Sequence, residues 1–167
     1  MIDDFLFEVP LSNLHTEWRA VTDQVMGGLS KARLKRGCRG GKGCQTLTAQ
    51  VSTANNGGFA QMTLDFAPQG GTFDARGFKG LSLVVRGNGE EYGVHLKTAD
   101  ISRPWQSYRA NFHATRSWQE IMLPWSAFQR HRIDTPLNVG VLRRLGIVAI
   151  GRPFKAEVSL ARLTLKG

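Results

Sequence analysis

The sequence lacks both long hydrophobic stretches and a recognisable leader. No apolar run approaches the roughly 20 residues that a membrane-spanning helix needs, so we expect no transmembrane segment. The residues from Met1 to Asp4 are acidic, without the basic and apolar regions of a secretory signal. We therefore expect a cytoplasmic protein, or a mitochondrial one if the chain is eukaryotic and processed.

Cysteine and histidine are too few and too scattered to predict a metal site. Cys38 and Cys44 alone do not complete a structural zinc site, and the four histidines lie at unrelated spacings. In a reducing compartment we expect both cysteines to be thiols in a flexible hairpin tip, with a disulfide between them as the alternative under oxidation. The sequence predicts no metal and no cofactor.

No arrangement of residues predicts catalysis. The run Gly28-Leu29-Ser30-Lys31-Ala32 has the spacing of a nucleophile elbow, but that motif needs a helix after the serine, and here a strand pattern follows. The run Gly87-Asn88-Gly89 is not completed into a dinucleotide-binding fingerprint. His95 and His113 lie in strand patterns without a catalytic partner. We expect no catalytic residue and no enzymatic activity.

Glycine, alternating apolar residues and positive charge are what the chain has instead. Its 167 residues include 19 glycines and few helix-favouring runs, and 41% of them are hydrophobic. The length is typical of one domain, here residues 1–167, and the composition is typical of an all-β protein. Alternating segments indicate about nine to eleven strands, which predicts a β-sandwich or jelly roll of antiparallel sheets.

Local patterns place several features of these strands. Residues 29–34 and 47–51 are expected to form a hairpin, and Gly87-Asn88-Gly89 is expected to close a second, tight one. The apolar phase changes near Ala161-Arg162, which predicts a β-bulge. We expect a helical turn at residues 125–128. We expect a short helix or a loop at residues 137–144, and an edge strand at residues 3–7.

Two glycine-rich segments are the most distinctive part of the chain, and we call them the first glycine corner (23–30) and the second glycine corner (55–59). Glycine adopts positive φ without strain and leaves the backbone open to close approach, so we expect the two corners to meet at one end of the sandwich. The candidate binding residues there are Asp23, Met26, Gly27, Gly28, Ser30, Asn55, Asn56, Gly57, Gly58 and Phe59. Capping of their own turns is the structural alternative for the aspartate and the asparagines.

Aromatic residues offer a second candidate surface. Trp105 and Tyr108, with Trp118 and Trp125, are of the kind that stacks on sugar rings. Packing in the core is the alternative, because a sandwich of this size accommodates four tryptophans without any ligand.

Positive charge is concentrated in one segment of the chain. The formal net charge is +9, and the segment holds Lys31, Arg33, Lys35, Arg36, Arg39 and Lys42 with no acidic residue among them. Such a patch attracts phosphate backbones, acidic proteins or anionic membranes. A solvated face that only keeps the protein soluble is the alternative, because no aromatic residues are interleaved with the basic ones.

The ordered motifs resemble those of the complex I intermediate-associated protein 30 family. The resemblance is carried by the first and second glycine corners, by Phe78-Lys79-Gly80-Leu81 with Arg86-Gly87-Asn88-Gly89, and by Gly151-Arg152-Pro153-Phe154. It implies a galactose-binding-like jelly roll, the fold of many carbohydrate-binding modules. The mitochondrial members of the family act as chaperones in complex I assembly, and the chain resembles the bacterial members, which are short single-domain proteins. Asn88 stands where the family often has Asp.

Three functions are compatible with these observations. The first is a non-catalytic interaction module, an assembly factor or chaperone-like protein for a multi-subunit complex such as a respiratory complex, with protein partners. The second is a carbohydrate-binding module that uses Trp105 and Tyr108. The third is nucleic-acid binding through the basic hairpin, which no recognised nucleic-acid motif supports.

Overall fold

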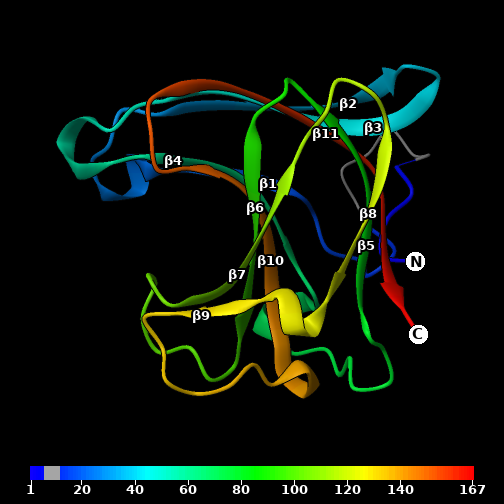
Figure 1. Ribbon diagram of the computed structural model, residues 1–167. Coiled ribbons are helices and arrows are strands. Elements are labelled where there is room, and N and C mark those ends of the chain that lie inside the picture. Colours follow the sequence, from blue (N-terminus) through cyan, green and yellow to red (C-terminus); the bar gives the residue numbers. More distant parts are fainter. Residues whose placement is uncertain (6–11) are drawn as a thin grey trace.

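In the computed structural model the protein is built from two antiparallel β-sheets packed face to face (Figure 1). The structure describes residues 1–5 and 12–167, except for the side chain of Asn56. The six-stranded sheet has the order β1 (Arg19–Thr22), β4 (Phe59–Asp65), β10 (Leu142–Ile150), β6 (Glu91–Thr98), β7 (Ser107–His113) and β9 (Gln129–His131). The five-stranded sheet has the order β2 (Lys31–Arg39), β3 (Lys42–Val51), β11 (Phe154–Lys166), β5 (Gly80–Gly87) and β8 (Gln119–Pro124). The predicted all-β sandwich is confirmed.

Alternation along the strands builds the core between the sheets. Leu47 on β3, Met62 on β4, Val94 on β6 and Ile147 on β10 are each 0% exposed, while their neighbours in sequence face outward. Successive side chains of a strand point to opposite faces, so a period of two gives each sheet one apolar face. Burial of these two faces against each other is the main stabilising contribution.

Within residues 1–5 and 12–167, five one-turn 3-10 helices lie between the strands, and no residue lies in an α-helix. Their bounds are η1 (Asp23–Met26), η2 (Ala54–Asn56), η3 (Pro68–Gly70), η4 (Trp125–Ala127) and η5 (Val139–Val141). The helical turn expected at 125–128 is confirmed as η4. The expectation for 137–144 was only partly right, since Leu142 already begins strand β10. No helix of the described residues is long and apolar enough to span a membrane.

The β-bulge predicted near Ala161-Arg162 is confirmed. Leu160 pairs with Val85 and Arg162 with the adjacent Val84, so the register shifts by one residue within β11. The extra residue lets Leu160 and Leu163 both be fully buried although they are an odd number of positions apart.

The tight hairpin predicted at Gly87-Asn88-Gly89 is wrong. The turn carries the chain from β5 in the five-stranded sheet to β6 in the six-stranded sheet, so the flanking strands do not pair. Both edges of β5 are occupied by β11 and β8, and the amides of Gly87 and Gly89 donate to the carbonyls of Thr115 and Ala114 at 2.7 and 2.8 Å. Turn chemistry indicates a reversal of direction but not which strands become neighbours.

The hairpin of β2 and β3 is longer than expected, and its tip is Gly40-Gly41, with φ of +56° and +79°. Cys38 and Cys44 therefore lie within the strands, which corrects their expected place in a flexible tip. Cys38 pairs with Gly43 and Cys44 with Gly37, so the two side chains point to opposite faces. Both cysteines are free thiols, Cys38 exposed and Cys44 buried.

One residue of the described amino-terminal segment forms a β-bridge with the five-stranded sheet. Asp3 forms a bridge with Leu163 of β11, but no longer strand precedes β1 in the part of the chain that the structure describes. Residues 6 and 7 of the edge strand expected at 3–7 lie outside the described residues.

Candidate functional site

The carboxylate of Asp23 joins the two glycine corners at one end of the sandwich. Its Oδ1 accepts from the amide of Ser30 at 2.9 Å, and its Oδ2 accepts from the Ser30 hydroxyl at 2.5 Å. From the second corner, the amides of Gly58 and Phe59 donate to Oδ2 at 2.6 and 3.2 Å. The corners meet as the sequence predicts, and a side chain with 0% exposure holds them together.

Glycine is required at this joint because the Asp23 side chain occupies the space beside two of the glycines. A Cβ on Gly28 or on Gly57 would overlap the Asp23 carboxylate. Gly27 ends η1 in the left-handed region, with φ +83°, and its carbonyl accepts from the Asn55 side chain at 3.2 Å. The glycine pairs are thus explained by close packing and backbone conformation within the fold.

Hydrogen bonding keeps Asp23 charged inside the protein. Burial by itself raises the pKa of this carboxyl, but the bonds from the Ser30 hydroxyl and from the amides of Gly58, Ser30 and Phe59 outweigh burial and lower its pKa below the usual value. The Ser30 hydroxyl is also fixed, because it accepts from the Ser52 amide at 2.9 Å. Both groups serve the joint and are closed to solvent, so neither is placed as a nucleophile or a general base.

The outward side of the first glycine corner is apolar. Val25, Met26 and Leu29 are 74%, 62% and 56% exposed, and we call these three residues the apolar corner. Ile150, which is 41% exposed, ends β10 opposite Phe59 at the same end of the sandwich. Of these four residues, the sequence predicts only Met26 as a candidate binding residue. Val25 and Leu29, the other two members of the apolar corner, could have been found from the sequence. They are apolar residues inside a glycine-rich turn, where no strand face buries them.

The predicted aromatic platform is not assembled. Trp105 is 57% exposed in the loop between β6 and β7, but Tyr108 is fully buried and its hydroxyl donates to the Thr135 carbonyl at 2.7 Å. The indoles of Trp118 and Trp125 are half-buried and donate to the carbonyls of Arg39 and Phe78 at 3.0 and 2.8 Å. Trp105 is therefore the one residue of the four that offers an exposed ring.

The basic patch is divided between two faces of the five-stranded sheet. Lys31, Arg33 and Lys35 alternate along β2 and are exposed, whereas Arg36 turns inward and forms an ion pair with buried Asp3 at 2.7 Å. The Arg36 guanidinium also lies 4.7 Å from the centre of the Phe5 ring. Arg39 pairs with Glu157 of β11, and Lys42 is exposed beside the hairpin tip. Arg36 is thus a structural residue and not part of the surface patch.

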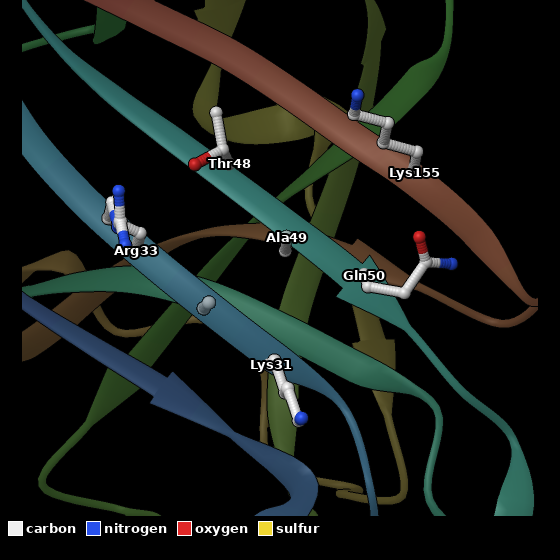
Figure 2. A pocket seen from close by; sticks show the side chains of 7 residues that line it. Lys31, Arg33, Thr48, Ala49, Gln50 and Lys155 are labelled. Carbon is white, nitrogen blue, oxygen red and sulfur yellow. The ribbon is translucent and has the colours of Figure 1, made fainter.

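A shallow hollow of about 280 Å³ lies on the outer face of the five-stranded sheet. Figure 2 shows Thr48 and Gln50 on the middle strand, β3, with Lys31 and Arg33 on one neighbouring strand and Lys155 on the other. The residues that line it are Lys31, Ala32, Arg33, Thr48, Ala49, Gln50 and Lys155. Exposed side chains around an open hollow give it positive charge without a defined binding geometry.

Comparison with known proteins adds a family and a set of structural neighbours. A family model described as Complex I intermediate-associated protein 30 matches residues 5–159. No curated protein matches the chain. Among solved structures, the family 11 carbohydrate-binding module of a cellulosomal cellulase of Clostridium thermocellum has a TM-score of 0.75 at 15% identity, covering 100% of this chain and 93% of that one.

Two further structures show the same fold. The family 11 module from Clostridium thermocellum in complex with a β-1,3-1,4-mixed-linked tetrasaccharide has a TM-score of 0.75 at 16% identity, covering 100% of this chain and 94% of that one. The family 30 carbohydrate-binding module of another Clostridium thermocellum cellulase has a TM-score of 0.68 at 13% identity, covering 99% and 98%. The expected jelly-roll β-sandwich is confirmed by these neighbours.

Proposed function

Since the chain belongs to the complex I intermediate-associated protein 30 family, we propose that it is a non-catalytic protein-binding module that assists the assembly of a multi-subunit complex, with the apolar corner as its docking surface. The observation that carries the proposal is the exposure of Val25, Met26 and Leu29 on a loop whose base is fixed by Asp23. A fixed base lowers the entropy lost when the loop is immobilised by a partner.

The chemistry of the apolar corner supports a protein partner. Clustered exposed apolar side chains on an otherwise polar surface are typical of interaction sites, and methionine adapts its shape to different apolar surfaces. Lys31 and Arg33 follow Leu29 on the adjoining strand, and the net charge of the chain is +9. The partner that fits is therefore a protein segment that presents apolar side chains flanked by acidic residues, and long-range attraction accelerates its encounter.

A non-catalytic role is supported by the state of the candidate residues. The carboxylate of Asp23 and the hydroxyl of Ser30 bond to each other and to backbone groups, and both residues are 0% exposed. Residues that act on a substrate need access to it.

Capture of partners from native cell extract tests the proposal. The tagged chain is compared with Met26→Asp and Leu29→Asp variants, with and without nuclease, and bound proteins are identified by mass spectrometry. We expect the wild type to enrich subunits of one complex in the presence of nuclease, and each variant to lose them. Met122→Asp is the matched control, because Met122 is 46% exposed on β8, away from the apolar corner.

Two results would contradict this proposal. If the apolar-corner variants retain the same subunits as Met122→Asp, the apolar corner is not the docking surface. If all enrichment disappears with nuclease, nucleic-acid binding through Lys31, Arg33 and Lys35 replaces protein binding.

Carbohydrate binding is the second candidate, and exposed Trp105 is the observation that favours it. The neighbours are 13–16% identical, so they support the fold alone, and a fold does not by itself assign a ligand. Calorimetric titration with a panel of glycans, including a β-1,3-1,4-mixed-linked tetrasaccharide, tests it. Saturable binding that is lost in Trp105→Ala and kept in Trp118→Phe supports a glycan site at Trp105; no saturation with any glycan rejects it.

A further inference from the structure

The outer face of the six-stranded sheet gathers positive charge from three adjacent strands. His95 and Lys97 on β6, Arg109 on β7 and His131 on β9 alternate with core-facing residues, and we call these four residues the cation cluster. His95 is directly opposite Arg109, and His131 is opposite Ser107, two residues before Arg109. Residues opposite one another on a sheet face have Cβ atoms about 5 Å apart, so the register brings the four side chains together.

No carboxylate of the described residues forms an ion pair with the cation cluster. Asp65, on β4 of the same face, is already bound by Arg144 at 2.7 Å and by Arg19 at 3.4 Å. The Lys97 amine donates to the Pro104 carbonyl at 2.7 Å, and the Arg109 Nε donates to the Ser107 hydroxyl at 2.8 Å. These two bonds orient the cations without neutralising them.

Partial burial makes this concentration of charge unfavourable when nothing is bound. Burial, with Arg109, His131 and Lys97 nearby, lowers the pKa of His95 to about 3. Burial, with Arg144 and Arg109 nearby, also lowers the pKa of Lys97. Burial with Arg132 nearby lowers the pKa of Arg109, and burial with Arg109 and Arg132 nearby lowers that of His131. A negative group among them would relieve this repulsion.

Two glycines beside the cation cluster let polar side chains lie close to the backbone of the sheet. Gly146 of β10 is opposite His95, and Gly93 precedes His95 by two residues on the same face of β6. Because these glycines have no side chains, the His95 imidazole lies close to Gly93 and the Gln61 amide lies close to Gly146. A Cβ on Gly93 would be 3.0 Å from His95 Nε2, and one on Gly146 would be 2.6 Å from Gln61 Oε1. Thr63, opposite Gly146, is 2% exposed, and its hydroxyl has no hydrogen-bond partner among the described residues.

We propose that this face binds a small anionic ligand, whose carboxylate or phosphate oxygens accept hydrogen bonds from Lys97 and Arg109, with His95 and His131 as further donors when protonated. Charge-assisted hydrogen bonds to guanidinium and ammonium groups are the usual way in which proteins hold such oxyanions. The loop that carries exposed Trp105 is tied to the cluster through the bond from Lys97 to Pro104. An aromatic ring at that border fits a ligand with a sugar or other ring beside its acidic group.

The test measures histidine pKa values by NMR, at constant ionic strength, with inorganic phosphate or glucuronate as the probe and neutral glucose as the uncharged comparison. The charged and titratable groups that face His95 are Arg109, His131 and Lys97. On β10, the residue opposite His95 is Gly146, which has no side chain. An anion among these cations favours the charged imidazole, so we expect the pKa of His95 to rise by about one unit or more. His113 is the internal control, because it is exposed on the same strand as Arg109 but four residues further along.

Variants assign the effect to the cation cluster. Lys97→Gln and Arg109→Gln are each expected to weaken probe binding at least tenfold, while Arg33→Gln, on the other sheet, leaves it unchanged. Thermal melting verifies that each variant is folded, and if Arg109→Gln is not, Lys97→Gln alone decides. Met26→Asp is expected to keep probe binding, which separates this site from the apolar corner.

Three outcomes would overturn the proposal. The first is that the His95 pKa does not rise with either anion, and the second is that the pKa of His113 rises equally. The third is that only a single-stranded RNA oligomer binds, with a steep dependence on salt, because that result would indicate a nonspecific polyelectrolyte surface. A response to phosphate alone or to glucuronate alone supports the proposal and identifies the acidic group of the ligand.

Discussion

Asp23 accepts a hydrogen bond at 2.6 Å from the amide of Gly58, which lies 35 residues later in the chain. Together with the bond from the Phe59 amide, this contact joins two separate turns into one unit, because the same carboxylate also holds Ser30 of its own corner. The apolar corner is the outer surface of that unit. The position of Val25, Met26 and Leu29 therefore depends on the buried Asp23 carboxylate, whose hydrogen bonds are made to other residues.

Asp23→Asn should destabilise the protein strongly at neutral pH. An amide has the same shape as the carboxylate, but its NH2 group is a donor and would face the N–H and O–H donors that the carboxylate now accepts from. A buried donor left without an acceptor costs about 1–3 kcal/mol, and more beside a charged partner. Urea unfolding at pH 7 measures the difference in the free energy of unfolding. Equal stability of the two proteins would show that Asp23 is not the joint of the corners.

The same substitution should change how stability depends on pH. The pKa of Asp23 is lowered in the folded protein, so its stabilising contribution is complete above the unfolded value of about 3.9 and is lost as the pH falls through the folded value. We expect the stability gap between the wild type and Asp23→Asn to narrow below about pH 4. Unfolding curves of both proteins between pH 2.5 and pH 7 give this gap, and a constant gap would contradict the prediction.

Gly28→Ala and Gly37→Ala form a matched pair of substitutions. A Cβ on Gly28 would overlap the Asp23 carboxylate, whereas one on Gly37, in strand β2, has no atom within 4 Å. Overpacking typically costs about 1–3 kcal/mol, so Gly28→Ala should lower the melting temperature while Gly37→Ala leaves it unchanged or raises it slightly. Calorimetry of the two variants distinguishes tight packing at the corner from a general sensitivity to the loss of glycine.

Arg36→Ala should be far more damaging than Lys35→Ala, its neighbour on β2. The Arg36 and Asp3 side chains are 6% and 4% exposed, so removing the arginine leaves a buried carboxylate without its cation. Breaking one partner of a buried pair costs about 3–5 kcal/mol, while an exposed lysine contributes within about 0.5 kcal/mol. Denaturant unfolding of both variants measures this difference, and similar values for the two would refute the inward placement of Arg36.

Thiol labelling of the native protein should report one reactive cysteine. Cys38 is exposed, whereas Cys44 is buried and its pKa is raised chiefly by burial. Because the thiolate is the reactive form, Ellman's reagent should modify Cys38 rapidly and Cys44 only after unfolding. Cys38→Ser should abolish the rapid phase and Cys44→Ser should preserve it. Two rapid thiols, or none, would contradict the strand positions of these residues.

The sequence was sufficient where a local pattern determines the structure. The alternation of apolar residues predicted the strands, and its change of phase located the bulge between Leu160 and Arg162. It was not sufficient where distant segments compete for neighbours: Gly87-Asn88-Gly89 has the composition of a hairpin turn, but β11 and β8 already occupy both edges of β5. Strand pairing is a property of the whole sheet, which no short motif contains.

The candidate site divides in the same way. The meeting of the glycine corners followed from their composition, but the carboxylate that joins them was visible only in three dimensions. The inward turn of Arg36 depends on Asp3, 33 residues earlier in the chain, and a basic segment alone does not distinguish this residue from Lys35. The cation cluster comes from three strands whose sequences are unremarkable separately, because register, and not spacing, brings His95 to Arg109.

The position of β2 has a consequence for how copies of the protein meet in concentrated solution. Among the described strands β2 pairs only with β3, so one side of its backbone is an open edge at which another β-chain would be able to add. Lys31, Arg33 and Lys35 line this edge at every second residue. Two copies that approached edge to edge would bring like charges together along the first half of the strand, so these basic side chains oppose the addition of a second copy at this edge.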